Sequence, residues 1–417
     1  AWSGMKAESI FWQLAIEDIQ TAADLLLPVY QATNTKDGYV SLEVNPLYAH
    51  DTQKTIEEAA SLSVKVNRPN LMIKIPATLE GLPAITEVIG QGINVNVTLI
   101  FSLERYAAVM EAYLAGLEKA VASGTDVSTL ASVASFFISR MDTKVDAELD
   151  KKLQTEAINR DDFELLKGKT AIANARLAYQ LFLKTFASQR FLALKAAGAQ
   201  VQRPLWASTS TKNPDYRDVV YVEELIGVDT VNTVPPATLE AFFNHGKAEK
   251  TIEHDLEQSQ LIFSELAEND ISVSQVTDEL EQEGVQAFAD AFAQLLAAVE
   301  SRRQYAARET RSLGHQLHSE LHDLAAQNFV ERMFDRDPSL WTDDPSGQEE
   351  IKIRMNWLTS PETSVHLEKV GADLLAECLS DGYTHAVLLG MGGSSLAPEV
   401  LSLIHKPDKQ ALKLLVL

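Results

Sequence analysis

Leu71-Met72-Ile73-Lys74-Ile75-Pro76-Ala77-Thr78 is a short apolar run with one charged side chain in its middle. The run predicts a buried β-strand, so Lys74 must either reach solvent or be kept for chemistry. A buried ammonium loses its hydration, and the neutral amine then becomes a usable nucleophile near neutral pH. The alternative interpretation is a lysine on an exposed edge strand. The residues around this run help to decide whether Lys74 lies on a buried strand or on an exposed edge strand.

Short strand-like runs alternate with amphipathic helical stretches from residue 39 onward. The predicted strands span residues 39–44, 71–75, 95–101, 133–138, 204–208 and 230–234, and the predicted helices include 83–90, 103–123, a long pair across 143–197, and 216–226. Alternating strands and helices indicate a parallel sheet, either an open doubly wound sheet or a closed (β/α)8 barrel.

Polar residues inside the predicted strands favour the barrel. Strand alternation places polar side chains on one face in three strands: Tyr39, Ser41 and Glu43; Lys74 with Met72; and Asn94, Asn96 and Thr98. A half-exposed antiparallel sheet gives the same alternation, but the intervening helices favour a parallel sheet covered on its outer face. Polar side chains aimed at a barrel axis form a catalytic mouth. The predicted fold class is therefore α/β, a (β/α)8 TIM-type barrel.

Only six of the eight strands of such a barrel are visible, so we expect the first two to lie upstream of Ala1. The chain begins without methionine and stops within the probable strand 413–417, which suggests a fragment truncated at both ends. The expected organisation is a barrel over residues 1–300, a helical connection over 301–350, and a partial second α/β domain over 351–417.

Composition excludes several classes of partner. The 417 residues carry a formal net charge of −23, which argues against nucleic acid and against anionic membrane surfaces but not against phosphorylated sugars. The single cysteine, Cys378, excludes an intramolecular disulfide and suits the cytoplasm. No stretch has the length and apolarity of a membrane span, and no signal-peptide pattern begins the chain.

A glycine-rich segment follows an apolar strand near the end of the chain. In Gly390-Met391-Gly392-Gly393-Ser394-Ser395, glycines allow backbone amides to approach a phosphate, and serines add hydroxyl donors beside a helix start. The predicted phosphate loop consists of Gly392, Gly393, Ser394 and Ser395. A tight turn without a ligand is the alternative.

Three histidines, His315, His318 and His322, share one predicted helical face and raise the question of a metal site. Leucines at 313, 317, 321 and 324 form the apolar stripe beside them. The histidines therefore fit the polar flank of that helix, and we predict no metal.

Five segments together resemble transaldolase over roughly residues 9–300. They are Val40-Ser41-Leu42-Glu43-Val44, Lys74-Ile75-Pro76-Ala77-Thr78, Asn94-Val95-Asn96-Val97-Thr98-Leu99, Ala134-Ser135-Phe136-Phe137-Ile138-Ser139-Arg140 and Leu205-Trp206-Ala207-Ser208-Thr209. The resemblance implies a cofactor-free enzyme of the pentose phosphate pathway. It would move a dihydroxyacetone unit from fructose 6-phosphate or sedoheptulose 7-phosphate to an aldose phosphate.

The resemblance also implies a role for each site residue. Lys74 would form the Schiff base, while Glu43 and Thr98 would hold the water that relays protons. Asn96 and Ser135 would bind the hydroxyls of the dihydroxyacetone unit. The sugar phosphate would contact Arg140 together with Ser208 and Lys212. The family's first-strand aspartate and second-strand contacts would have to come from residues before Ala1.

The segment around Ala386–Val400 resembles the sugar-phosphate-binding start of phosphoglucose isomerase, over roughly residues 305–417. Transaldolase–isomerase fusions support both assignments, and the isomerase domain would be incomplete in this chain. Two other functions stay open: an aldolase that releases free dihydroxyacetone, and a non-catalytic sugar-phosphate-binding fragment.

Overall fold

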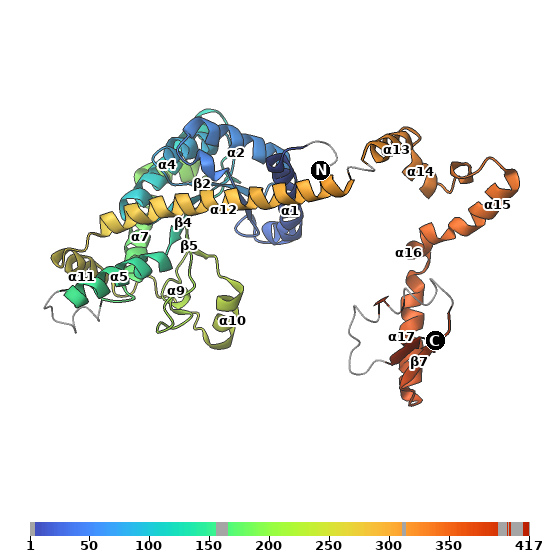
Figure 1. Cartoon of the computed structure of the whole chain (residues 1–417). Helices are drawn as coiled ribbons and strands as arrows, with labels where there is room; N and C mark the ends of the chain where they lie inside the picture. The colour runs from blue at the N-terminus through green and yellow to red at the C-terminus, as the bar shows by residue number, and fades with distance from the viewer. Residues whose placement is uncertain are drawn as a thin grey trace. The chain divides into compact units, whose positions relative to one another are not determined.

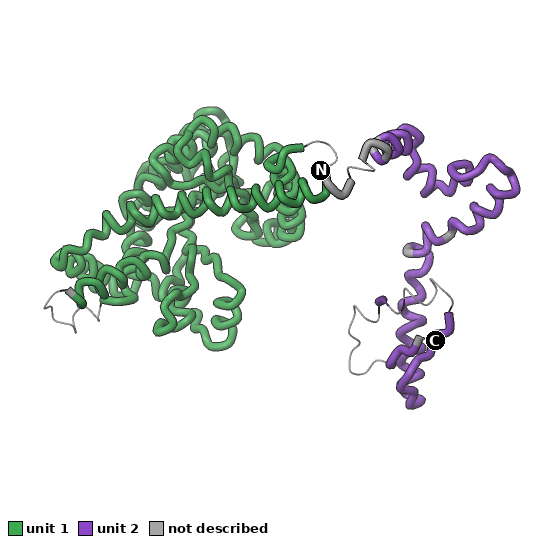
Figure 2. Tube along the Cα trace, in the orientation of Figure 1, with its two compact units in different colours: residues 1–309 green, residues 310–417 purple. Residues whose placement is uncertain are grey.

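The structure is a computed structural model that describes residues 5–155, 166–310, 314–390, 398, 400–401 and 412–416. The chain divides into two compact units, residues 1–309 (unit 1) and 310–417 (unit 2), which Figure 2 draws in different colours. Among the described residues, no helix combines the length and apolarity needed to cross a membrane.

The centre of unit 1 is a parallel sheet, which holds six strands in the described part of the chain (Figure 1). They are β1 Val40–Glu43, β2 Leu71–Pro76, β3 Val95–Ile100, β4 Ser132–Phe137, β5 Arg203–Ala207 and β6 Val231–Asn232. Each strand pairs with the next one along the chain. The sheet curls as part of a barrel does, which confirms the α/β class and is consistent with a TIM-type barrel.

Helices connect these strands and cover the sheet. They are α1 Ala7–Ala32, η1 Pro46–Tyr48, α2 Thr52–Val66, α3 Gly81–Gly90, α4 Leu103–Ala122, α5 Ser139–Thr155, α7 Thr170–Phe186, α8 Gln189–Ala196, α9 Val220–Glu223, α10 Pro236–His245, α11 Leu256–Glu268 and α12 Val273–Thr310. Side-chain caps start several of them: the Asp51 carboxylate accepts from the Lys54 amide at α2, and the Ser102 hydroxyl accepts from the Arg105 amide at α4.

Two helix predictions differ from the structure. The long pair expected across 143–197 is divided among α5, α7 and α8. The break between α7 and α8 comes at Ser188, which leaves the helical conformation and caps α8. The helix expected over 216–226 is confined to α9, since the preceding residues form turns.

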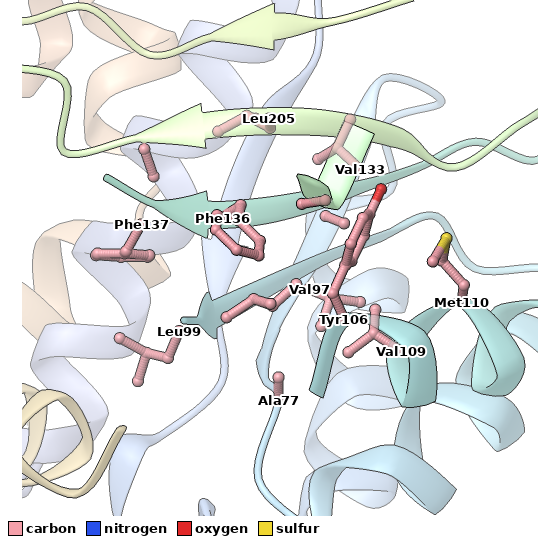
Figure 3. Close-up of a cluster of buried hydrophobic side chains, with 14 of the residues drawn as sticks. Ala77, Val97, Leu99, Tyr106, Val109, Met110, Val133, Phe136, Phe137 and Leu205 are labelled. Carbon is pink, nitrogen blue, oxygen red and sulfur yellow. The ribbon is translucent and has the colours of Figure 1, made fainter. Parts of the chain in front are cut away.

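The hydrophobic core lies between the sheet and its helices. Figure 3 shows Val97 and Phe136 of neighbouring strands beside Tyr106, Val109 and Met110 of α4. All five side chains are buried. Burying a side chain of this size contributes roughly 1.5–3 kcal/mol relative to exposing it. This core fixes the strands, and with them the polar side chains on the opposite face.

Unit 2 contains shorter elements. They are α13 Gly314–Ala326, α14 Phe329–Phe334, η2 Pro338–Leu340, α15 Pro345–Arg354, η3 Met355–Thr359, α16 Ser360–Thr363, α17 Val365–Ser380, β7 His385–Leu388 and β8 Lys413–Val416. In the stretch expected to connect domains, Asp337 and Asp344 cap η2 and α15. The two predicted strands pair in parallel, with His385 opposite Lys413.

Several predicted features of unit 2 lie outside the described residues. The phosphate-loop residues Gly392, Gly393, Ser394 and Ser395 are among them, as are the side chains of His315 and His318.

Candidate active site

Lys74 and Glu43 form an ion pair on the inner face of the sheet. They occupy paired positions on neighbouring strands β2 and β1, and Lys74 Nζ lies 2.8 Å from Glu43 Oε2. Both side chains are about one-fifth exposed, at 22% and 21%. Strand β2 pairs with β1 on one side and with β3 on the other, so the edge-strand alternative for Lys74 is wrong.

Burial changes the proton affinity of Glu43. Desolvation raises the pKa of its carboxyl above the usual value, and the nearby Lys74 ammonium opposes that shift through its charge and its hydrogen bond. The carboxyl therefore gains a proton more readily than a solvated glutamate does. Glu43 is placed to exchange a proton with whatever reacts at Lys74 Nζ.

A chain of hydrogen bonds runs across the same face. Ser135 Oγ donates to Asn96 Oδ1 at 2.7 Å, and Asn96 Nδ2 donates to Ser41 Oγ at 3.0 Å. Ser41 and Asn96 belong to β1 and β3, which β2 separates, and two strand spacings amount to about 10 Å. A 3.0 Å contact over that separation requires the inner face to be concave. The polar side chains therefore converge above β2.

Thr98 lies at the carboxyl end of β3, opposite Pro76 of β2. It is fully buried, and its hydroxyl has no hydrogen-bond partner among the described residues. The next residue, Leu99, has a φ of +61°, and the pairing of β3 with β4 shifts register between Val97 and Ile100. Such a bulge re-aims the side chains around it. A buried hydroxyl with an unused donor is suited to bind a ligand or water.

The ends of β4 and β5 meet beside two residues predicted to bind phosphate, Ser208 and Arg140. Ser139 Oγ lies 3.0 Å from Ser208 Oγ, and the Ser139 amide donates to the Ser208 carbonyl. Ser208 has a φ of +57°, a strained conformation for a non-glycine residue. Arg140 follows Ser139 and lies over the ring of Phe137, with 5.4 Å from Cζ to the ring centroid. Ser208 is therefore held beside the start of the helix that carries Arg140.

Lys212 lies farther along the loop after β5. It is exposed, and its ammonium donates to Ser210 Oγ at 2.9 Å. It lines a cavity of about 230 Å³ together with Asp142, Asp146 and Tyr216. Among the described residues, no hydrogen bond or ion pair joins Lys212 to another predicted site residue.

Two aspartate–tyrosine pairs join α5 to the segment that follows β5. Asp142 Oδ2 accepts from Tyr221 at 2.7 Å, and Asp146 Oδ2 accepts from Tyr216 at 2.6 Å. Because the aspartates are four residues apart, they share one face of α5. These pairs fix the loop that carries Ser208 against the helix that carries Arg140.

The long helix α12 supplies a contact that sequence reasoning missed. Its Phe288 ring lies over Lys74, with 5.1 Å from Nζ to the ring centroid. Phe288 follows Lys74 by more than two hundred residues, and its helix carries no motif, so no signal in the sequence joins the two. Ser41, by contrast, was already on the polar face of its predicted strand.

A second cavity lies away from these residues. It has a volume of about 500 Å³ and is lined by α7, α9 and α11, including Arg176 and Glu224. These two side chains already form an ion pair at 2.6 Å. The predicted site residues contribute nothing to its walls.

Comparisons with known proteins agree with this geometry. A family model described as "Transaldolase/Fructose-6-phosphate aldolase" matches residues 2–299. The chain belongs to this family. A transaldolase of Frankia alni is 52% identical over 283 residues, which cover 68% of this chain and 75% of the relative. Transaldolase 1 of Streptomyces avermitilis is 50% identical over 297 residues, covering 71% and 77%. Transaldolase 2 of a Nostoc species is 48% identical over 308 residues, covering 72% and 80%.

Membership in the transaldolase/fructose-6-phosphate aldolase family applies to unit 1. The matched residues contain β1 to β6 and every predicted site residue from Glu43 to Lys212. Residues 300–417 lie beyond the match.

Proposed function

We propose that the chain is a class I transaldolase that works through a Schiff base on Lys74. It transfers a dihydroxyacetone unit from a ketose phosphate, fructose 6-phosphate or sedoheptulose 7-phosphate, to an aldose phosphate. The observation that carries the proposal is the 2.8 Å contact between Lys74 Nζ and Glu43 on the concave face of the sheet. Family membership and the names of the relatives support the same activity. The reaction needs no cofactor.

Lys74 and Glu43 have complementary tasks in this reaction. The neutral amine of Lys74 attacks the ketose carbonyl and forms a carbinolamine, which loses water to give an iminium ion. Glu43 removes and returns the protons of these steps, and its burial supports this task because it raises the carboxyl pKa. We assign Thr98 to the water that relays these protons, since its buried hydroxyl has no other partner among the described residues.

The iminium drives cleavage of the carbon–carbon bond. The hydroxyl on the departing carbon gives its proton to the first-strand aspartate that the family resemblance implies. The iminium accepts the bonding electrons as the bond two atoms from the nitrogen breaks, so an aldose phosphate leaves with a new carbonyl group and an enamine stays on Lys74. Asn96 and Ser135, joined by their 2.7 Å hydrogen bond, bind the hydroxyls of the dihydroxyacetone unit. Arg140, Ser208 and Lys212 bind the phosphate, because a guanidinium, a hydroxyl and an ammonium all donate to phosphate oxygens.

Unit 2 carries the second part of the proposal. We assign residues 351–417 to an incomplete sugar-phosphate-binding domain of the glucose-6-phosphate isomerase type, joined to the barrel of residues 1–300 by residues 301–350. The parallel pairing of β7 with β8 supports a strand–helix–strand unit there. Gly392, Gly393, Ser394 and Ser395 are proposed as its phosphate loop.

Borohydride trapping tests the proposed function of unit 1. Incubation with fructose 6-phosphate and borohydride is expected to fix a three-carbon adduct on the peptide that contains Lys74. Lys74→Arg keeps a positive charge but has no amine that can become neutral, so trapping is expected to disappear. Lys119→Arg, which replaces a lysine paired with Glu87 on the surface, serves as the matched control and is expected to trap normally.

The location of the adduct decides the result. An adduct on a different lysine would remove Lys74 from the mechanism. A protein that binds fructose 6-phosphate and is never trapped would favour the non-catalytic alternative.

A further inference from the structure

Lys212 precedes a tight turn in the segment after β5. The Tyr216 amide donates to the Asn213 carbonyl, and the Asn213 side chain accepts from the Asp215 amide at 3.0 Å. An asparagine side chain that bonds the backbone two residues ahead stabilises a turn of this kind. Lys212 is therefore joined to Tyr216 by a short, hydrogen-bonded piece of backbone.

The side chain of Tyr216 fastens the far end of this turn to α5. Its hydroxyl donates to Asp146 Oδ2 at 2.6 Å, and the other carboxylate oxygen, Oδ1, accepts from the Gly168 amide at 3.0 Å. The ring also lies close to Gly168, where an added Cβ would come within 2.7 Å of Tyr216 Cζ. The position of the ring is thus fixed by a hydrogen bond at its hydroxyl and by close packing beside it.

The helix that holds Tyr216 also carries Arg140. Asp146 and Arg140 both belong to α5, which spans Ser139–Thr155. Through Asp146 and Tyr216, the backbone at Lys212 is held in a fixed position relative to this helix. Tyr216 therefore places one cation of the proposed phosphate site relative to the other.

Lys212 depends on this anchor more than Ser208 does. Ser208 has its own contact, 3.0 Å from Ser139 Oγ at the end of β4. Lys212 is exposed, and its flexible side chain bonds only to Ser210 nearby in the loop among the described contacts. The attraction between a cation and a phosphate falls as their separation grows, so a displaced loop weakens the hold of Lys212 on a phosphate.

We propose that Tyr216 is a positioning residue that makes the enzyme select phosphorylated over unphosphorylated ketoses. By holding the loop against α5, it keeps Lys212 within reach of a phosphate bound at Arg140. This inference rests on the proposed function and adds a residue to its phosphate site. Lys74 and Glu43 lie on β2 and β1, so imine formation itself does not depend on Tyr216.

The experiment compares fructose 6-phosphate with fructose in the full chain, through the second-order rate constant of borohydride trapping. Wild type is expected to prefer the phosphorylated ketose. Tyr216→Phe removes only the hydroxyl that reaches Asp146. Its constant for fructose 6-phosphate is expected to fall about tenfold, equivalent to one weakened hydrogen bond to a charged group, while its constant for fructose stays unchanged. Inorganic phosphate, used as a competitor of fructose 6-phosphate, is expected to bind more weakly to the variant by the same factor.

Two substitutions at Asp146 test the hydrogen bond itself. Asp146→Ala removes it, and the ratio of the two rate constants is expected to fall at least as far as in Tyr216→Phe. Asp146→Asn keeps Oδ1 for the Gly168 amide, and its Nδ2 can donate to the tyrosine oxygen, which also accepts hydrogen bonds. Its ratio is expected to stay near that of wild type.

A double substitution tests whether Tyr216 acts through Lys212. Lys212→Met removes the ammonium and keeps an unbranched side chain, so adding Tyr216→Phe to it is expected to lower the ratio no further. Tyr113→Phe is the matched control. It also loses a tyrosine hydroxyl that bonds elsewhere, to the Gln200 carbonyl at 2.8 Å ahead of β5, and its ratio is expected to equal that of wild type.

An unchanged ratio in Tyr216→Phe, with trapping intact, overturns the role of Tyr216 alone. Equal falls for both ketoses, or an equal fall of the ratio in Tyr113→Phe, also overturn it, because the substitution would then loosen the protein generally. A ratio in Asp146→Asn as low as in Asp146→Ala overturns the hydrogen bond as the cause, and a full further fall in the Lys212→Met background overturns action through Lys212. Absence of trapping in wild type with both ketoses overturns the proposed function and this inference together.

Discussion

In the proposed reaction, proton transfer at Lys74 depends on the side chain of Glu43. Glu43→Gln keeps almost the same shape and a hydrogen-bond acceptor but cannot gain or lose the proton. We expect imine formation to slow by at least ~10²-fold while the fold is retained, the usual effect of losing general acid–base help. Stopped-flow borohydride trapping measures the rate, and circular dichroism checks the fold. Near-wild-type turnover in this variant would exclude Glu43 from proton transfer.

Strand alternation predicted the polar face that carries Glu43, Lys74 and Asn96, whereas Ser135 was assigned by resemblance. Asn96 and Ser135 contact each other, and Lys74 contacts Glu43, because side chains of parallel neighbours on one face must meet. Alternation says nothing about loops, so Lys212 was placed only by resemblance. Phe288 was not predictable, because its position depends on how a distant helix packs across the strand ends.

At the scale of elements, α5 is joined to the segment after β5 by Asp142 and Asp146. Burial raises the pKa of Asp142 to about 7, against hydrogen bonds from the Ala171 amide and Tyr221 that lower it. Since the folded pKa lies above the ordinary 3.8, the folded state binds this proton more tightly than the unfolded state. The stabilisation is complete below pH about 4 and is lost as pH rises through about 7.

Asp142→Asn tests this dependence because it stays neutral at every pH. For this one group, wild type is expected to lose up to about 1.4 kcal/mol of unfolding free energy per pH unit between these limits. We expect the unfolding free energy of the variant, measured by urea titration at pH 5.5, 6.5 and 7.5, to change less with pH than that of wild type. Tyr221→Phe keeps the carboxyl, so its unfolding free energy should change with pH as that of wild type does. An equal pH dependence in wild type and Asp142→Asn would show that this carboxyl does not titrate between pH 5.5 and 7.5.

The strands of unit 1 were predictable because apolar runs of strand length stand between clear turn signals. The six predicted strands all appear, with ends shifted by up to two residues. Helix ends were less predictable: α8 begins where Ser188 caps it, and nothing in the apolar periodicity marks that break. Before α9, turns replace the expected helix, and Tyr216 in this stretch donates a hydrogen bond to Asp146.

At the scale of the whole molecule, the predicted site residues of the Lys74 reaction lie in unit 1. The division at residues 309 and 310 leaves that unit with its own sheet and core. We expect a chain ending at Glu309 to keep borohydride trapping and donor cleavage at the rates of the 417-residue chain. Parallel kinetics and thermal unfolding of the two chains measure this. Loss of trapping in a folded shorter chain would place part of the catalytic machinery in unit 2.

The chain-order pairing of β1 to β6 has a consequence for how the protein is made. Each strand from β2 to β6 pairs with the strand that was synthesised before it, so the sheet can grow from the amino-terminal end while the ribosome is still translating. Glu43 and Lys74 meet when the first two strands pair, about two hundred residues before Phe288 emerges. A nascent chain therefore carries the proposed nucleophile Lys74 paired with Glu43 but uncovered, and the translation of α12 ends that period of exposure.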